Sequence, residues 1–358
     1  MMKLPVAIPY LMSSAVALAA RKNLIIDTDL FSDVDDAGAL LLAATSPQVN
    51  LLAINVNSPS TFSALAASAI LAHYGLPEVP IGVRRPLTND TFFDSWSYEL
   101  GEYTSKVAFH FSGGSLPWGH AEEAWDPVAL YRKVLAEAED DSVTITSIGF
   151  FENLSGLLNS TADSYSDLSG RALVARKVSE LVVMGGDYPS GHEFNFWGSS
   201  ASLTAHVINT WEGRMVFVGD SVGKNVKSGG RLMVEGPDND PVRMSYIYYT
   251  YYTPRPSWDP LAVVYAMNGL GDLFEFGNGY GYNHVEADGS NRWVWDSQVR
   301  NQFFLRLKAD EEIVAAELDR LFLQGALSVS KPPTTKTPQK MPMFATASNP
   351  TKSIRKEL

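Results

Sequence analysis

Five aspartates lie within ten residues of one another in the stretch LIIDTDLFSDVDDAGALLLAA, at Asp27, Asp29, Asp33, Asp35 and Asp36. Carboxylates this close repel one another unless a cation, or a proton held at a raised pKa, relieves the repulsion. The chain has no cysteine, which excludes zinc-thiolate sites and cysteine nucleophiles and leaves oxygen as the ligand for any metal. A dense cluster of carboxylate oxygens favours a hard divalent cation such as Ca²⁺.

Other interpretations of the cluster compete with a metal site. Asp35 and Asp36 directly precede AGALLLAA and would occupy the first turn of a helix, where the helix dipole favours carboxylates. That does not explain Asp27 and Asp29, which end an apolar strand. An EF-hand loop starting at either of them would lack the required Gly at position six and Glu at position twelve. A phosphatase with an aspartyl nucleophile also opens with a strand and Asp-x-Asp, so this hypothesis stays open.

The segments that must position these side chains alternate between strand and helix patterns. Apolar runs typical of strands occur at 23–29, 49–57, 142–149, 178–186 and 214–220, and helical patterns occur at 36–46, 62–75 and 153–160. This alternation predicts an α/β fold with a mainly parallel sheet flanked by helices. Each strand run ends in Gly, Asp or Asn, and loops at the carboxyl ends of parallel strands collect ligands.

The remaining segments set the expected domain organisation. Residues 86–125 are predicted to be a loop excursion, 278–297 one or two β-hairpins, and 301–324 the final helix. The apolar start, with a small-residue Ala-Leu-Ala sequence at 17–19, predicts a signal peptide over 1–20 and hence secretion, with the endomembrane lumen as the alternative. One domain is expected over 23–325, followed by a disordered Pro- and Thr-rich tail at 331–358.

The charge of the chain argues against some partners. Its net charge is -12 and its body contains no basic run, so a nucleic-acid polymer is not an expected partner. Nothing after the leader is apolar for long enough to span a bilayer, so no membrane partner is expected either.

The aspartate stretch DTDLFSDVDDAGAL resembles the N-terminal signature DTDxGxDDAxAL of the inosine-uridine-preferring nucleoside hydrolase family. Four later stretches resemble family segments in the same order: residues 53–83, then TSIGFFENLSG, LVVMGGDYPSGHEFNFWGSSAS and PSWDPLAVVYA. Together they cover the chain from about residue 23 to 323. The resemblance implies a nucleoside hydrolase-like fold with a mainly parallel, Rossmann-like sheet, and we expect a divergent, secreted member of fungal type.

The resemblance also implies an activity and a site. Members hydrolyse the N-glycosidic bond of ribonucleosides to base and ribose, so a small-molecule nucleoside is the expected substrate and Ca²⁺ the expected cofactor. Asp29 would bind the metal and act as the general base toward a metal-held water. The other implied metal ligands are Asp36, Asp259 and the carbonyl oxygen of Ile148. The implied substrate-binding residues are Asp35, Asn57, Glu193, Asn195 and Trp258. Because family members often assemble, a homodimer or homotetramer is expected.

Several positions depart from the family pattern. Five residues separate Asp29 from Asp35, more than is usual, so Asp33 is additional and the register of the carry-over is open by a few residues. The family's usual His before the last Asp, a proton donor to the leaving base, is Trp258 here, which either stacks on a purine or packs in the core. His192 is a candidate acid or a structural residue, and the tyrosines of 246–252 either line a base pocket or form a helix face. These departures keep two alternatives open: a non-hydrolysing sugar-binding relative and, next, the phosphatase.

Overall fold

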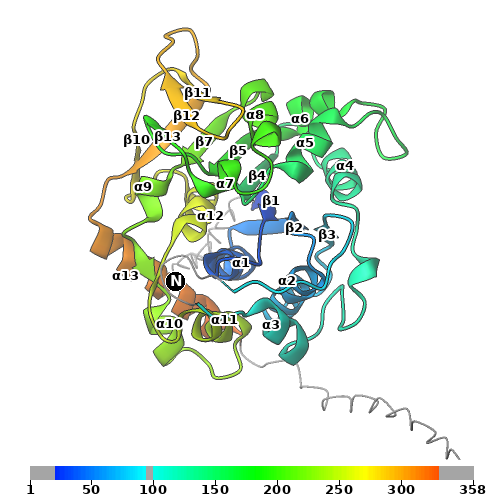
Figure 1. Cartoon of the computed structure of the whole chain (residues 1–358), viewed down its shortest axis with the longest axis vertical. Coiled ribbons are helices and arrows are strands. Elements are labelled where there is room, and N and C mark those ends of the chain that lie inside the picture. Colours follow the sequence, from blue (N-terminus) through cyan, green and yellow to red (C-terminus); the bar gives the residue numbers. More distant parts are fainter. Residues whose placement is uncertain (1–20, 94–99, 330–358) are drawn as a thin grey trace, which may run out of the picture.

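The centre of the protein is an eight-stranded sheet with the strand order β10-β13-β7-β5-β4-β1-β2-β3 (Figure 1). The computed structural model describes residues 21–93 and 100–329, so the predicted signal peptide and tail lie outside the described residues. All neighbouring strands are parallel except β10, which runs antiparallel to β13. The strands of this sheet are β1 (Lys22–Thr28), β2 (Val49–Val56), β3 (Ile81–Val83), β4 (Val143–Ile148), β5 (Val178–Met184), β7 (Met215–Val218), β10 (Phe274–Phe276) and β13 (Gln302–Leu307).

Helices cover both faces of this sheet. They are α1 (Asp35–Thr45), α2 (Thr61–His73), α3 (Thr104–His110), α4 (Pro127–Glu137), α5 (Glu152–Asn159), α6 (Gly170–Lys177), α7 (Phe194–Trp197), α8 (Ala201–Thr210), α9 (Asp220–Gly223), α10 (Gly230–Glu235), α11 (Pro241–Thr250), α12 (Trp258–Asn268) and α13 (Glu311–Ser328), with a 3₁₀ turn at Ala121–Glu123. Two small sheets complete the fold: β6 (Ser190–Gly191), β11 (Tyr282–Val285) and β12 (Asn291–Val294) form one, and β8 (Lys227–Ser228) and β9 (Arg255–Pro256) the other.

Burial on both faces explains why the central strands are apolar without interruption. Leu24 and Ile26 of β1 pack into one hydrophobic core with α1, α2, α12 and α13, whereas Ile25 packs into the other with α4, α5, α6 and α8. Removing each of these side chains from water contributes about 1.5–3 kcal/mol to folding. The predicted α/β class is therefore confirmed, with the sheet between two helical layers (Figure 1).

The order of the strands determines where a ligand can bind. From β1 the chain builds outward through β2 and β3, then returns to the other side of β1 and continues through β4, β5 and β7. The connection after β1 therefore leads toward β2, and the connection after β4 leads toward β5 in the opposite direction. The place between β1 and β4 is the switch point of the sheet. In open parallel sheets the crevice at the carboxyl ends of two such strands is the usual ligand site. Asp29 follows β1 and Gly149 follows β4, so both lie at this point.

The structure corrects one predicted element and gives the detail of two others. Residues 301–324 do not form one helix: β13 occupies Gln302–Leu307, and α13 begins only at Glu311. The apolar residues of 303–307 suit either period, and the short turn before α13 separates a sheet strand from the helix. Residues 282–294 form the predicted antiparallel hairpin of β11 and β12. The excursion at 86–125 contains α3 and a 3₁₀ turn. Within the described part of the chain, no helix has both the length and the apolar character needed to cross a membrane.

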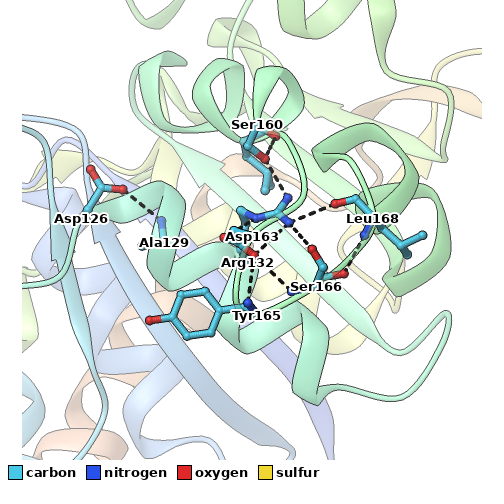
Figure 2. A network of polar contacts seen from close by, with 9 residues as sticks. Asp126, Ala129, Arg132, Ser160, Asp163, Tyr165, Ser166 and Leu168 are labelled. Atoms are coloured by element: carbon cyan, nitrogen blue, oxygen red, sulfur yellow. Dashed lines mark hydrogen bonds and ion pairs between the residues drawn. The ribbon is translucent and has the colours of Figure 1, made fainter.

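Helix α4 links the outer layer to the floor of the ligand crevice. Its Arg132, 2% exposed, donates to Asp163, Ser160 and the carbonyl oxygens of Ser166 and Leu168, fixing the loop after α5 (Figure 2). The neighbouring residue, Tyr131, donates its hydroxyl to Asp27 Oδ2 at 2.8 Å. Arg132 is therefore a structural residue, and it holds the helix that supports the first aspartate of the cluster.

Candidate active site

A cavity of about 570 Å³ opens at the carboxyl edge of the central sheet. Eight carboxylate side chains line it: Asp29, Asp33, Asp35, Asp36, Asp187, Glu193, Asp220 and Asp259. The remaining lining residues are Ser32, Phe92, Met184, His192, Phe194, Asn195, Trp197, Arg255 and Trp258. A cavity of about 710 Å³ beside α10, α12 and α13 is larger, but its acidic residues are not buried together. The acidic cavity at the switch point is therefore the candidate site.

Three carboxylates meet on the floor of this cavity. One oxygen from each of Asp35, Asp36 and Asp259 lies within 4.8 Å of the other two, and all three residues are buried. Asp35 and Asp36 lie in the first turn of α1, and Asp259 lies in the first turn of α12. Asp35 Oδ2 also accepts the backbone N–H groups of Trp258 and Asp259, at 2.9 and 3.1 Å. Two helix N-termini thus converge on the cluster.

Helix dipoles alone do not balance this arrangement. Two carboxylate oxygens no more than 4.8 Å apart repel each other by about 3.5 kcal/mol or more at an effective dielectric constant of about 20. A helix N-terminus contributes typically about 0.3–1 kcal/mol to a nearby carboxylate. Burial, followed by mutual repulsion, accordingly raises the pKa of Asp36 and Asp259 well above the ordinary value. The cluster needs either protons or a cation.

The donor set fits a hard divalent cation. Asp36 Oδ1 accepts a hydrogen bond from the Thr28 hydroxyl, whereas no residue within 21–93 or 100–329 donates to the buried Asp36 Oδ2. Oxygen atoms from several carboxylates are the ligands that Ca²⁺ prefers. We call Asp35, Asp36 and Asp259 the close group. Asp36 and Asp259 are two of the predicted metal ligands, and the third member is Asp35 rather than Asp29.

Asp29 lies beside this group on the first residue after β1. It is 5% exposed, and burial together with the repulsion of Asp33 raises its pKa to about 7. The Ser32 hydroxyl donates to its Oδ2 at 3.3 Å. Ile148, the predicted carbonyl ligand, ends β4 opposite Thr28 in the strand register. A Cβ atom on the next residue, Gly149, would lie 2.5 Å from the backbone nitrogen of Asp29, so the missing side chain permits the close approach.

Glu193 and Asn195, which the sequence predicts to bind substrate, line the same cavity. Glu193 is the N-cap of α7: its Oε1 accepts from the Asn195 backbone at 2.9 Å and its Oε2 from Gly186 at 3.0 Å. Burial raises the pKa of Glu193 to about 8. The Asn195 amide nitrogen donates to the Met184 carbonyl at 3.4 Å. The two side chains are therefore fixed before any ligand binds.

The structure places Asn57 differently from the prediction. Asn57 is fully buried outside the cavity lining, and its amide nitrogen donates to Asp27 Oδ1 at 2.7 Å and to the Phe150 carbonyl at 3.0 Å. Asp27 itself accepts from Tyr131 and Asn153 as well. Asn57 thus belongs to a network beneath the site in place of the expected ribose contact, because the buried Asp27 carboxylate needs donors.

The aromatic and histidine candidates occupy the cavity wall in different ways. Trp258 lines the cavity, but its indole N–H donates to the Asp220 carbonyl at 2.9 Å, so only its ring is left for a ligand. His192 lies at the rim, stacked on Trp197. Its Nε2 contacts the Asp288 carbonyl at 3.0 Å, which can only accept, so Nε2 carries the proton of the neutral ring. No tyrosine of the described run 246–252 lines this cavity, and Tyr246 and Tyr249 are buried in the core.

An ion pair lies in the cavity wall, and only one of its two residues stood out in the sequence. Asp33, the additional aspartate of the lengthened loop, accepts from Arg255 Nε at 2.9 Å and also pairs with Nη2. Arg255 lies 222 positions later, in β9, and three residues before Trp258. The extra residue in the aspartate signature indicated a local change there. Nothing in the sequence pattern indicated its partner.

Comparison with known proteins gives one family and a set of similar folds. A family model described as inosine-uridine preferring nucleoside hydrolase matches residues 24–292. A purine-preferring ribonucleoside hydrolase from Gardnerella vaginalis is 16% identical at a TM-score of 0.61, over 86% of this chain and 99% of that one. A plant nucleoside hydrolase is 17% identical at 0.60, over 84% and 99%. An inosine-uridine preferring nucleoside hydrolase from Bacillus anthracis is 16% identical at 0.58, over 85% and 99%. No curated protein matches the chain.

Proposed function

Since the chain belongs to the inosine-uridine preferring nucleoside hydrolase family, we propose that it hydrolyses the N-glycosidic bond of ribonucleosides to free base and ribose. The observation that supports this most directly is the group of buried carboxylates on two helix N-termini at the switch point of the sheet.

The metal ligands belong to this proposal. Asp36 and Asp259 would hold a Ca²⁺ ion, together with Asp29, the carbonyl oxygen of Ile148 and, by its position in the close group, Asp35. When bound, a divalent cation offsets the repulsion of these carboxylates and lowers the pKa of water next to it. The unpartnered Asp36 Oδ2 and the raised pKa values of the group support this assignment.

Asp29 has the position that a general base requires. It lies at the cavity surface beside the close group, and its only side-chain hydrogen bond among the described residues comes from Ser32. A carboxylate that keeps an oxygen free toward the cavity can accept the proton of the attacking water as that water bonds to C1′. Asp27, with three donors, has no such freedom.

The other carboxylates favour the charge that develops on the sugar. Breaking an N-glycosidic bond builds positive charge on the ribose ring. Negative groups fixed around the ring stabilise this charge without reorganising during the reaction. Asp35, Glu193 and Asn195 are held by backbone contacts in the cavity, where they would bind the ribose hydroxyls.

The test is a hydrolysis assay on the purified protein. Inosine, guanosine, uridine and nicotinamide riboside are incubated with the protein in chelator and in Ca²⁺, and both base and reducing sugar are measured. We expect release of base and ribose in equal amounts with Ca²⁺, and loss of turnover in chelator. Ribose binding without release would instead favour a sugar-binding relative, and turnover of an aryl phosphate would favour the phosphatase.

A further inference from the structure

The Asp33–Arg255 pair carries a function of its own, which rests on the proposed hydrolase activity. We propose that Arg255 binds the departing nucleobase and selects bases with two adjacent hydrogen-bond acceptors, as 6-oxopurines have. Trp258 stands where the family usually has a proton-donating His, and it cannot supply a proton to the leaving base. The Arg255 guanidinium would contact the leaving base instead.

The contacts of Arg255 leave one side of its guanidinium for a ligand. Asp33 accepts from Nε and Nη2 along one edge. Within the described residues Nη1 has no acceptor, so both of its N–H groups and the outer N–H of Nη2 remain. The side chain is 18% exposed and lines the cavity. An edge with one N–H from each of Nη1 and Nη2 is a two-donor fork.

The guanidinium is held in place from several sides. Arg255 pairs through its backbone with Ser228 in the β8–β9 ladder. Its Cζ lies 5.5 Å from the ring centroid of Tyr249 and 5.8 Å from that of Trp258. Both rings and the Asp33 carboxylate restrict the side-chain rotamers. A donor that is fixed before binding loses little entropy when it meets its acceptor.

The position of the pair indicates which part of a substrate it faces. Asp35, Asp36 and Asp259 occupy the floor, where the ribose and the cation would lie. Arg255 instead packs beside Trp258, in the wall next to the floor. A phosphate is not the expected ligand, because eight carboxylates line the same cavity and would repel it. A neutral base with exposed acceptors avoids that repulsion.

His192 does not supply the same contact. Its Nε2 proton is used by the Asp288 carbonyl, so neutral His192 has only an acceptor at Nδ1. Among the described lining residues, Arg255 is then the one side chain that is positively charged at every physiological pH. It donates without losing a proton, so the base would not receive a proton from it.

The balance of the reaction shows what this contact would do. The C1′–N9 bond breaks and its electron pair stays with the base, while water adds its hydroxyl to C1′ and gives its proton to Asp29. Negative charge therefore grows on the purine, shared with N7 and O6. The Arg255 fork donates to those two atoms, as arginine does to the same edge of guanine. The base then takes a proton from solvent water, and Asp29 returns its own to solvent.

The experiment compares two leaving groups in one set of variants. Hydrolysis of inosine needs help for its base, whereas 4-nitrophenyl β-D-ribofuranoside releases a phenolate that leaves unaided. For Arg255→Gln we expect kcat/KM for inosine and guanosine to fall about 10- to 150-fold, the range for a hydrogen bond to a charged group. We expect less than a threefold change for the nitrophenyl riboside and a smaller loss for adenosine, which presents a donor beside N7.

Two further variants separate this role from a structural one. Asp33→Asn/Arg255→Gln removes both charges, so no unpaired carboxylate is left, and it should show the same selective loss. Arg214→Gln is the control: Arg214 forms a similar pair with Glu180 away from the cavity, and its guanidinium also lies over an aromatic ring. This variant should leave kcat/KM unchanged for both substrates. Equal losses on inosine and the nitrophenyl riboside in the double variant would overturn the proposal, as would unchanged inosine hydrolysis. If the parent hydrolyses neither compound, the proposed function itself fails.

Discussion

Two aspartates only two positions apart have different surroundings in this protein. Asp27 is fully buried and accepts hydrogen bonds from Tyr131, Asn57 and Asn153. Asp29 lines the cavity and receives only the long contact from Ser32 among side chains of the described residues. Burial raises the pKa of each to about 7. At the scale of single residues, the first is therefore a structural group and the second has the freedom of a catalytic one.

The substitution Asp29→Asn tests that assignment. It keeps the shape and removes the proton acceptor, so kcat should fall about 10²- to 10⁴-fold, the usual contribution of a general base. The melting temperature should stay at or above that of the parent, because a buried charge is removed. Steady-state rates with Ca²⁺ and thermal unfolding measure the two effects.

Asp27→Asn is the matched control for this variant. It places an amide group among three donors, so we expect it to lower the free energy of unfolding by about 1–3 kcal/mol. If Asp29→Asn retained activity within threefold of the parent, Asp29 would not be the base.

At the scale of elements, the site depends on how closely β1 and β4 approach at their carboxyl ends. The register pairs Thr28 with Ile148, and the chain then continues to Asp29 on one strand and Gly149 on the other. A Cβ on Gly149 would lie 2.5 Å from Asp29 N and 2.8 Å from Asp29 Oδ1. The absence of one side chain thus allows Asp29, the proposed base, to lie against the neighbouring strand.

Gly149→Ala should therefore impair catalysis through position alone. Overpacking of this kind typically lowers stability by about 1–3 kcal/mol, and the displaced Asp29 should lower kcat by at least about tenfold. Gly279→Ala is the control, since a Cβ there meets nothing within 4 Å. Urea unfolding and initial rates are measured on both, and equal activity of the two variants would show that this approach is not critical.

At the scale of the whole molecule, the buried carboxylates link stability to pH. Burial raises the pKa values of Asp27 and Asp29 to about 7 and that of Glu193 to about 8, well above the ordinary values of these carboxyl groups. The folded state therefore binds more protons than the unfolded state between about pH 4 and pH 8. Stability that is present below pH 4 is consequently lost as the pH rises through this window.

We predict that the chelated protein is less stable at pH 8.5 than at pH 5.5, by several kcal/mol. Saturating Ca²⁺ should flatten this dependence, because the cation binds the ionised carboxylates of the folded state. At 100 times its dissociation constant it adds about 2.7 kcal/mol. Urea unfolding at both pH values, in chelator and in Ca²⁺, measures the effect. A chelated protein that gains stability toward pH 8.5, or no gain from Ca²⁺, would contradict the metal assignment.

The order of the elements around the site could be predicted from the amino-acid pattern alone. The apolar runs at β1, β2, β4, β5 and β7 were predictable because interior parallel strands are buried on both faces. The carboxylates at the ends of β1 and α1 were predictable because they break that apolar pattern. Residues 301–324 were assigned wrongly, since a short apolar run fits both a strand and a helix when its neighbours are unknown.

Which of the aspartates converge, and which groups each one contacts, depends on how the elements pack. Asp259 joins Asp35 and Asp36 because α1 and α12 pack side by side with both N-termini at the same edge of the sheet. Asn57 donates to Asp27, and Arg255 donates to Asp33, for a similar reason. A buried or half-buried carboxylate accepts hydrogen bonds from the donors that the fold places beside it. Partners more than two hundred positions apart leave no periodic trace in a sequence, because their contact depends on the packing of several elements at once.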